Sequence, residues 1–158
     1  MARPTRHAPQ AGALSSERTF FATTKTYAGR RLLESDRNAS LLIEVLRSYV
    51  LQGKFEIHDF VVMPDHVHVL LTVRGATTVE KAMQLIKGRF SYRLKHEFGY
   101  LGEVWQVGFS ESRADDAESF ERCRAYIVQN PVRAGLAKRS GEYPYCYGYL
   151  AEQKRRRG

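Results

Sequence analysis

The sequence predicts an α+β domain in which helices pack on an antiparallel sheet, in the element order β-α-β-β-α-β-α. Short runs rich in β-branched and aromatic residues alternate with longer segments whose apolar residues recur at helical spacing. Two consecutive strand-like runs are separated only by Pro64 and Asp65, which predicts an antiparallel hairpin. A βαβ unit interrupted in this way corresponds to a ferredoxin-like or RRM-like arrangement.

The first elements follow from local composition. Residues 18–26 are rich in Thr and Phe and form the first predicted strand. Asp36 or Asn38 can cap a helix over residues 39–52, where the apolar side chains share one face, and Gly53 ends it.

The remaining elements follow the same signals. In chain order they are strands at residues 55–63 and 66–73, a helix at 78–98, a short strand at 104–109 and a final helix that ends at Asn130. Asp115 and Asp116 give the final helix an acidic start with the character of a capping box. Pro131 predicts its end, because the residue before a proline disfavours helical geometry.

Length and composition describe one globular domain. The chain has 158 residues, of which 43% are hydrophobic and 27% charged, which suffices for a single core. We expect a flexible arm over residues 1–17, the folded domain over residues 18–150 and a basic tail over residues 151–158. No apolar run approaches the length of a membrane span. Cys123 and Cys146 fit neither a zinc spacing nor a disulfide framework, which favours the cytoplasm.

The charge balance favours a polyanionic partner. Lys and Arg number 25 against 17 Asp and Glu, so the formal net charge is +8. For a small domain this most often indicates nucleic acid, and a protein that is merely basic is the alternative. Five side chains are candidates for holding DNA phosphates, each with a solvated surface position as its alternative: Lys87, Arg89, Arg93, Arg122 and Arg133.

His66 and His68 form a candidate metal-binding pair. They lie two residues apart on a predicted strand, so both point to one face while Val67 and Val69 point to the other. Two neutral imidazoles with an oxygen donor suit Mg²⁺, Mn²⁺ or Zn²⁺. Surface or packing histidines are the alternative interpretation of this pair.

Tyr126 lies beside the predicted core face of the last helix. Phe120 and Ile127 fall on the core face, whereas Tyr126 and Asn130 lie one turn apart on a neighbouring stripe. Tyr126 can therefore present its hydroxyl to a cleft. A ring that packs at the edge of the core is the alternative.

These motifs together resemble a known family. HVH at residues 66–68 and YIVQNPVRAGL at residues 126–136 are similar to the single-tyrosine HUH transposases of the IS200-like family, in particular the REP-associated tyrosine transposases. The resemblance extends over residues 20–149; the string at residues 126–136 is specific, and the HVH pair adds weight only in combination with it. Two departures lie outside the proposed site: Asp65 stands where Asn is common, and YCYG at residues 145–148 replaces a stretch that usually contains Trp-Ser-Ser.

The resemblance implies an HUH endonuclease fold and a DNA transposase, a metal-dependent single-stranded DNA endonuclease and strand transferase. It implies that His66, His68 and Asn130 bind a divalent metal, Mg²⁺ or Mn²⁺, and that Tyr126 is the catalytic nucleophile that forms a 5′-phosphotyrosine. The implied partner is single-stranded DNA that contains a hairpin from a palindromic repeat. The implied setting is the bacterial cytoplasm, in association with the nucleoid, as a monomer or homodimer.

Two alternatives from other classes stay open. One is a non-catalytic nucleic-acid-binding module on the same RRM-like fold. The other is a metal phosphodiesterase that uses water as its nucleophile. A covalent adduct between protein and DNA distinguishes the transposase from both, because neither alternative forms one.

Overall fold

The computed structural model describes residues 16–158, so nearly all of the arm expected over residues 1–17 lies outside the described residues. In chain order its elements are β1 (Arg18–Lys25), the short 3-10 helix η1 (Tyr27–Gly29), α2 (Asp36–Leu51), β2 (Glu56–Met63), β3 (His66–Val73), α3 (Val79–Phe98), β4 (Ser110–Arg113), α4 (Ala117–Arg133) and α5 (Tyr147–Arg157). The strands form one antiparallel sheet in the order β2-β3-β1-β4. The predicted α+β fold is confirmed.

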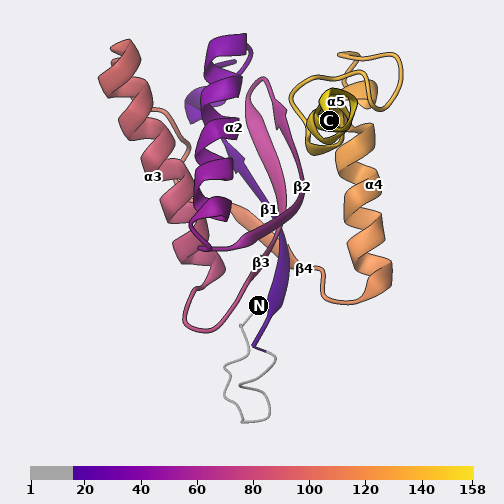
Figure 1. Cartoon of the computed structure of the whole chain (residues 1–158). Helices are drawn as coiled ribbons and strands as arrows, with labels where there is room; N and C mark the ends of the chain where they lie inside the picture. Colours follow the sequence, from indigo (N-terminus) through magenta and orange to yellow (C-terminus); the bar gives the residue numbers. More distant parts are fainter. Residues whose placement is uncertain (1–15) are drawn as a thin grey trace.

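Helices cover both faces of the sheet. Figure 1 shows α2 and α3 on one side and α4 on the other. Val67, Val69 and Leu71 of β3 belong to the core cluster shared with α2 and α3, whereas Leu70 packs with Ile127 of α4. Because side chains alternate along a strand, His66 and His68 must point with Leu70 toward α4.

The ends of α2 and α3 lie close to their predicted positions. The side chain of Ser35 caps α2, one residue before the expected Asp36, and accepts a hydrogen bond from the backbone N–H of Asn38 at 3.2 Å. The cap of α3 is Thr78, and Gly99 ends that helix in the left-handed conformation with φ of 68°, which favours glycine.

The strand predicted at residues 104–109 is wrong. The edge strand is β4, which begins after that segment and pairs with β1 through exposed polar residues. Within the expected segment, Trp105 forms only one isolated bridge, to Thr26. Its indole packs against Phe90 with ring centroids 5.5 Å apart. The apolar pattern therefore reflects an irregular segment packed on α3, since buried side chains alone do not specify a strand.

The predicted end of the last helix at Asn130 is also wrong. Helix α4 continues through the buried Pro131 to Arg133. A proline in this position removes one backbone donor, but the helical bonding continues beyond it, because the Ala134 N–H bonds to the carbonyl of Asn130 at 3.0 Å. This extra turn keeps Arg133 within α4, the helix that also carries Tyr126 and Asn130.

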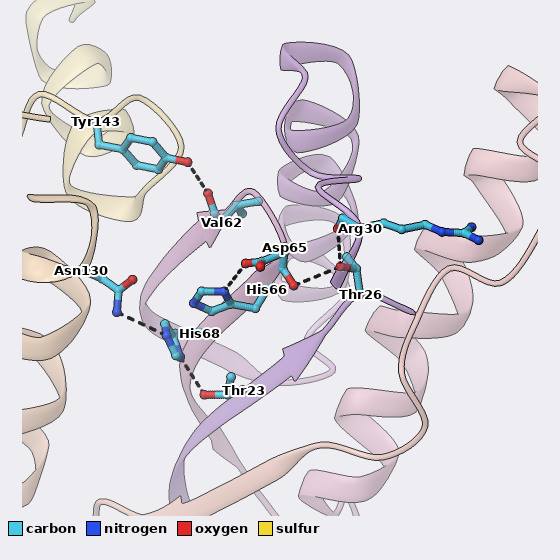
Figure 2. A network of polar contacts seen from close by, with 9 residues as sticks. All are labelled: Thr23, Thr26, Arg30, Val62, Asp65, His66, His68, Asn130 and Tyr143. Carbon is cyan, nitrogen blue, oxygen red and sulfur yellow. Dashed lines mark hydrogen bonds and ion pairs between the residues drawn. The ribbon is translucent and has the colours of Figure 1, made fainter. Parts of the chain in front are cut away.

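The C-terminal segment covers the outer edge of β2. The N–H of Val62 donates to the carbonyl of Tyr145 at 2.9 Å, and Figure 2 shows the hydroxyl of Tyr143 donating to the carbonyl of Val62, at 2.7 Å. Burial raises the pKa of Tyr143 to about 12, so this hydroxyl remains a donor at neutral pH. The segment expected as a basic tail over residues 151–158 is helical, because α5 extends through it to Arg157.

Candidate active site

His66 and His68 lie side by side at the start of β3. Their ring centroids are 4.7 Å apart, with an angle of 77° between the rings. Nδ1 of His66 lies 2.7 Å from Oδ1 of Asp65, and Nδ1 of His68 lies 2.6 Å from Oγ1 of Thr23 (Figure 2). Each imidazole is thus oriented through Nδ1 by an oxygen atom, an arrangement that is typical of histidines that bind a metal through Nε2.

Asn130 joins this pair from α4. Its Nδ2 lies 3.4 Å from Nε2 of His68, and the residue is only 9% exposed (Figure 2). A rotation of the terminal amide exchanges its nitrogen and oxygen, so the same side chain can turn an oxygen donor toward the imidazole. The three residues predicted to bind metal therefore come together from two elements.

Burial keeps the imidazole of His68 neutral. Desolvation, and then the neighbouring His66, lower the pKa of His68 to about 3. Only a neutral imidazole has a lone pair for a metal ion, so no proton competes for this position at neutral pH.

The residues present supply donor atoms that could hold a divalent cation. Within residues 16–158 no group of three or more His, Cys, Asp or Glu side chains could hold a metal ion. The available donors are the two Nε2 atoms of His66 and His68 and the amide oxygen of Asn130. Three neutral donors leave coordination positions for water and phosphate oxygens, as Mg²⁺ and Mn²⁺ require in sites that act on phosphates.

Tyr126 lies against the histidine pair. Its ring centroid is 5.2 Å from that of His68 and 5.9 Å from that of Phe21, edge-on in both cases. The guanidinium of Arg133 lies 5.3 Å from the centre of the same ring. Tyr126 is 39% exposed, so part of this residue beside His68 is accessible to solvent.

Two residues that orient the site were not identified from the sequence. Phe21 stacks on His68 with centroids 5.3 Å apart, and Thr23 holds Nδ1 of the same imidazole. Both come from β1, which pairs with β3 in the sheet. Their alternation along β1 shows that they share a face, but only the register between the two strands shows which residues they meet.

The candidate phosphate-binding residues fall into two groups. Arg133 lies at the site, and Arg122 lies on the same helix, exposed and 3.8 Å from Glu118. The other three candidates, Lys87, Arg89 and Arg93, lie on α3, which covers the opposite face of the sheet (Figure 1). The structure therefore does not bring the α3 cations to the histidines.

Two of the α3 cations have internal partners. Arg93 forms ion pairs with Glu97 and Glu44 at 2.6 and 2.7 Å, and hydrogen bonds to these carboxylates raise its pKa. Lys87 donates to the carbonyl oxygen of Gly108 at 2.7 Å, and burial lowers its pKa. These contacts give both side chains a structural role that needs no DNA.

Comparison with known proteins identifies a family that covers most of this chain. The family described as "Transposase IS200 like" matches residues 23–130, a range that contains Thr23, the histidine pair, Tyr126 and Asn130. A REP-associated tyrosine transposase of Escherichia coli (strain K12) is 29% identical over 107 residues, which are 65% of this chain and 62% of that protein. The chain thus spans less than two thirds of the length of this curated relative.

Solved structures show the same fold. A REP-associated tyrosine transposase bound to a REP hairpin is 25% identical and superimposes with a TM-score of 0.64, over 92% of this chain and 82% of that one. A Deinococcus radiodurans R1 protein with a provisional transposase assignment is 20% identical, with a TM-score of 0.55 over 80% of this chain and 95% of that one. Within residues 16–158 no helix combines the length and the apolarity needed to cross a membrane. From its matched range and its fold, this chain belongs to the IS200-like transposase family.

Proposed function

We propose that this protein is a metal-dependent transposase that cuts and rejoins single-stranded DNA through a covalent bond to Tyr126. The observation that carries this proposal is the contact between the rings of Tyr126 and His68, at 5.2 Å. It supports the proposal because it brings the ring of a possible nucleophile next to an imidazole whose Nδ1 contacts Thr23. A bound Mg²⁺ or Mn²⁺ would polarise the scissile phosphate and offset its negative charge.

The side chains of this protein supply the remaining functions. Asp65 and Thr23 fix the rings of His66 and His68, so the two Nε2 atoms are oriented before a ligand arrives. Tyr126 attacks phosphorus after its hydroxyl loses a proton to water. The guanidinium of Arg133, beside the same ring, would contact the phosphate of a bound strand.

A tyrosine nucleophile gives strand transfer in place of hydrolysis. Its attack forms a 5′-phosphotyrosine and releases a 3′-hydroxyl, so the number of phosphoester bonds is unchanged. A second 3′-hydroxyl can then reverse the step and join two strands without ATP. A metal phosphodiesterase would activate water and needs no tyrosine at this position.

We infer that the substrate is single-stranded DNA with a hairpin formed by a palindromic repeat. A relative with the same fold is bound to a REP hairpin, and the net charge of +8 favours a polyanion. An unpaired strand next to a hairpin also gives Tyr126 access to a phosphate. Such a substrate would keep the protein with the bacterial nucleoid.

The decisive experiment follows a covalent adduct. A hairpin oligonucleotide labelled at its 3′ end is incubated with protein and Mn²⁺ and separated on a denaturing gel, because the 5′-phosphotyrosine retains the 3′ fragment. We expect a shifted protein–DNA band with the native protein and with the control variant Tyr92→Phe, whose ring is exposed on α3. Tyr126→Phe should give neither the band nor cleavage.

Two other results would support the alternatives. Cleavage by Tyr126→Phe would favour the phosphodiesterase that uses water. Binding without cleavage by the native protein, in the presence of either metal, would favour the non-catalytic nucleic-acid-binding module.

A further inference from the structure

Lys25 faces the histidine pair, although no motif draws attention to it. In the antiparallel pairing of β1 with β3, Thr23 lies opposite His68 and Lys25 lies opposite His66. Residues directly opposite each other in a sheet share a face. The bond of 2.6 Å between Thr23 and His68 shows that this face is the one that carries the site, so the side chain of Lys25 starts beside His66.

Phe21, Thr23 and Lys25 form a row along one face of β1. Phe21 contacts the ring of Tyr126 at one end of this row, and Lys25 lies opposite His66 at the other. Alternate residues on a strand are about 6.6 Å apart, so the row is roughly 13 Å long. Along this row the histidine pair therefore lies between the ring of Tyr126 and the strand position of Lys25.

Lys25 is free to contact a ligand. Lys25 is exposed, and no residue among 16–158 forms a hydrogen bond or an ion pair with its ammonium group. Arg93, by contrast, is held by two carboxylates. An unpaired cation at the rim of a candidate phosphate site indicates an anionic partner.

The geometry of phosphoryl transfer indicates which oxygen atom of the substrate the Lys25 ammonium group would contact. The attacking and leaving oxygens lie roughly in line on opposite sides of phosphorus. If phosphorus lies over the two Nε2 atoms, with Tyr126 at one end of the row, the departing oxygen points to the other end. We propose that Lys25 is a catalytic residue that stabilises negative charge on the departing 3′-oxygen of the DNA, an inference that rests on the proposed function.

Apart from water, the step needs no further reagent to balance. The Tyr126 oxygen gives its proton to water and forms a bond to phosphorus, while the bond between phosphorus and the 3′-oxygen breaks. The electron pair of that bond stays on the 3′-oxygen, which accepts a hydrogen bond from the Lys25 ammonium group and then takes a proton from water. Lys25 keeps its charge throughout, so it can orient an incoming 3′-oxygen in the reverse step as well.

A substrate with sulfur in place of the bridging 3′-oxygen tests this role. A thiolate is a stable leaving group that gains little from a nearby cation, whereas an alkoxide gains much. We expect Lys25→Gln to slow cleavage of the oxygen substrate about 100-fold at saturating DNA, because loss of one donor to a developing oxyanion has this order of effect. On the sulfur substrate the variant should cleave at nearly the native rate.

Matched variants separate this role from general charge. Lys25→Arg should recover most of the rate on the oxygen substrate. Lys54→Gln should behave like the native protein, because Lys54 is exposed just before β2, at the opposite end of the sheet, and its loss changes the net charge equally. Circular dichroism checks that each variant is folded.

The possible failures are distinguishable. An equal loss of rate on both substrates, or a loss confined to the DNA dissociation constant, would overturn the role of Lys25 at the leaving oxygen. A native rate for Lys25→Gln on the oxygen substrate would do the same, while a persisting Tyr126 adduct would leave the proposed function intact. Absence of any adduct with the native protein would overturn both.

Discussion

The hydroxyl of Thr23 lies 2.6 Å from Nδ1 of His68. On the other side of the same ring, Nδ2 of Asn130 lies 3.4 Å from Nε2. With the Asn130 amide in this orientation, its N–H would donate to Nε2, and the proton of His68 would be on Nδ1, facing the Thr23 oxygen. A metal bound at Nε2 requires this same tautomer, so the Thr23 hydroxyl lies where it can accept from Nδ1 and hold His68 in the metal-binding form.

Thr23→Val should weaken metal binding. Valine has the same shape but no hydroxyl, so Nδ1 of His68 loses its acceptor and the ring loses its fixed tautomer. We expect Mn²⁺ affinity to fall about 10- to 100-fold, with DNA binding retained, as measured by calorimetric titration. Thr24→Val is the control, because Thr24 is buried and bonds to Gly108. Equal Mn²⁺ affinity in both variants would contradict this role.

The three proposed metal ligands should differ in importance. His66→Ala and His68→Ala each remove an imidazole nitrogen and should abolish cleavage, as should EDTA with the native protein. Asn130→Ala should be milder, because water can replace a neutral amide oxygen. The measurement is the rate of hairpin cleavage as a function of Mn²⁺ concentration. Full activity in EDTA would exclude a metal role for these residues.

The metal-free protein should lose stability in acid, and His68 should account for part of that loss. In the folded chain burial lowers the pKa of His68 from 6.5 to about 3. Between these values the unfolded chain binds a proton here and the folded chain does not. The free energy of unfolding therefore falls as the pH falls from 6.5 toward 3, by at most about 1.4 kcal/mol per pH unit. Above pH 6.5 this histidine contributes no pH dependence.

Urea unfolding in EDTA at several pH values between 7 and 4.5 checks this expectation. His68→Gln cannot bind the proton in either state, so its stability should depend less steeply on pH than that of the native protein. His96→Gln serves as the control, because His96 is exposed on α3. Parallel curves for all three proteins would show that His68 is not the group responsible.

Strand periodicity explains why the histidine pair was predictable. His66 and His68 lie within one strand, and a period of two residues fixes their common face without knowledge of the rest of the fold. Thr23 and Lys25 were not predictable as site residues, because their positions depend on how β1 pairs with a strand that follows it by about 40 residues in the chain. Local sequence does not encode that register.

Helical periodicity has a similar limit. It shows that cations share a helix, but it does not show which face of the sheet the helix covers. Lys87 and Arg89 were candidates on composition, yet α3 packs on the face away from the histidines. Periodicity placed Asn130 one turn after Tyr126 but did not show that it would be buried against His68, which follows from the packing of α4 toward β3.

The basic end of α5 should contribute to DNA binding through charge. Deletion of residues 152–158 removes four positive charges and one negative charge, Glu152. The fold should persist, because none of these residues belongs to the two buried apolar clusters and Leu150 is retained. Nonspecific binding of single-stranded DNA should weaken. Its dependence on salt should become shallower by at most about 0.7 in the logarithmic slope for each phosphate that the protein no longer neutralises.

Salt titrations with a repeat hairpin and with a random single strand measure both effects. A full-length variant in which Lys154, Arg155, Arg156 and Arg157 are replaced by Gln separates the loss of charge from the loss of helix, and it should match the truncated protein. Preference for the hairpin should remain in both proteins, because selectivity would come from the folded domain that carries His66, His68 and Tyr126. A truncated protein that loses hairpin preference at unchanged nonspecific affinity would show instead that α5 reads the DNA.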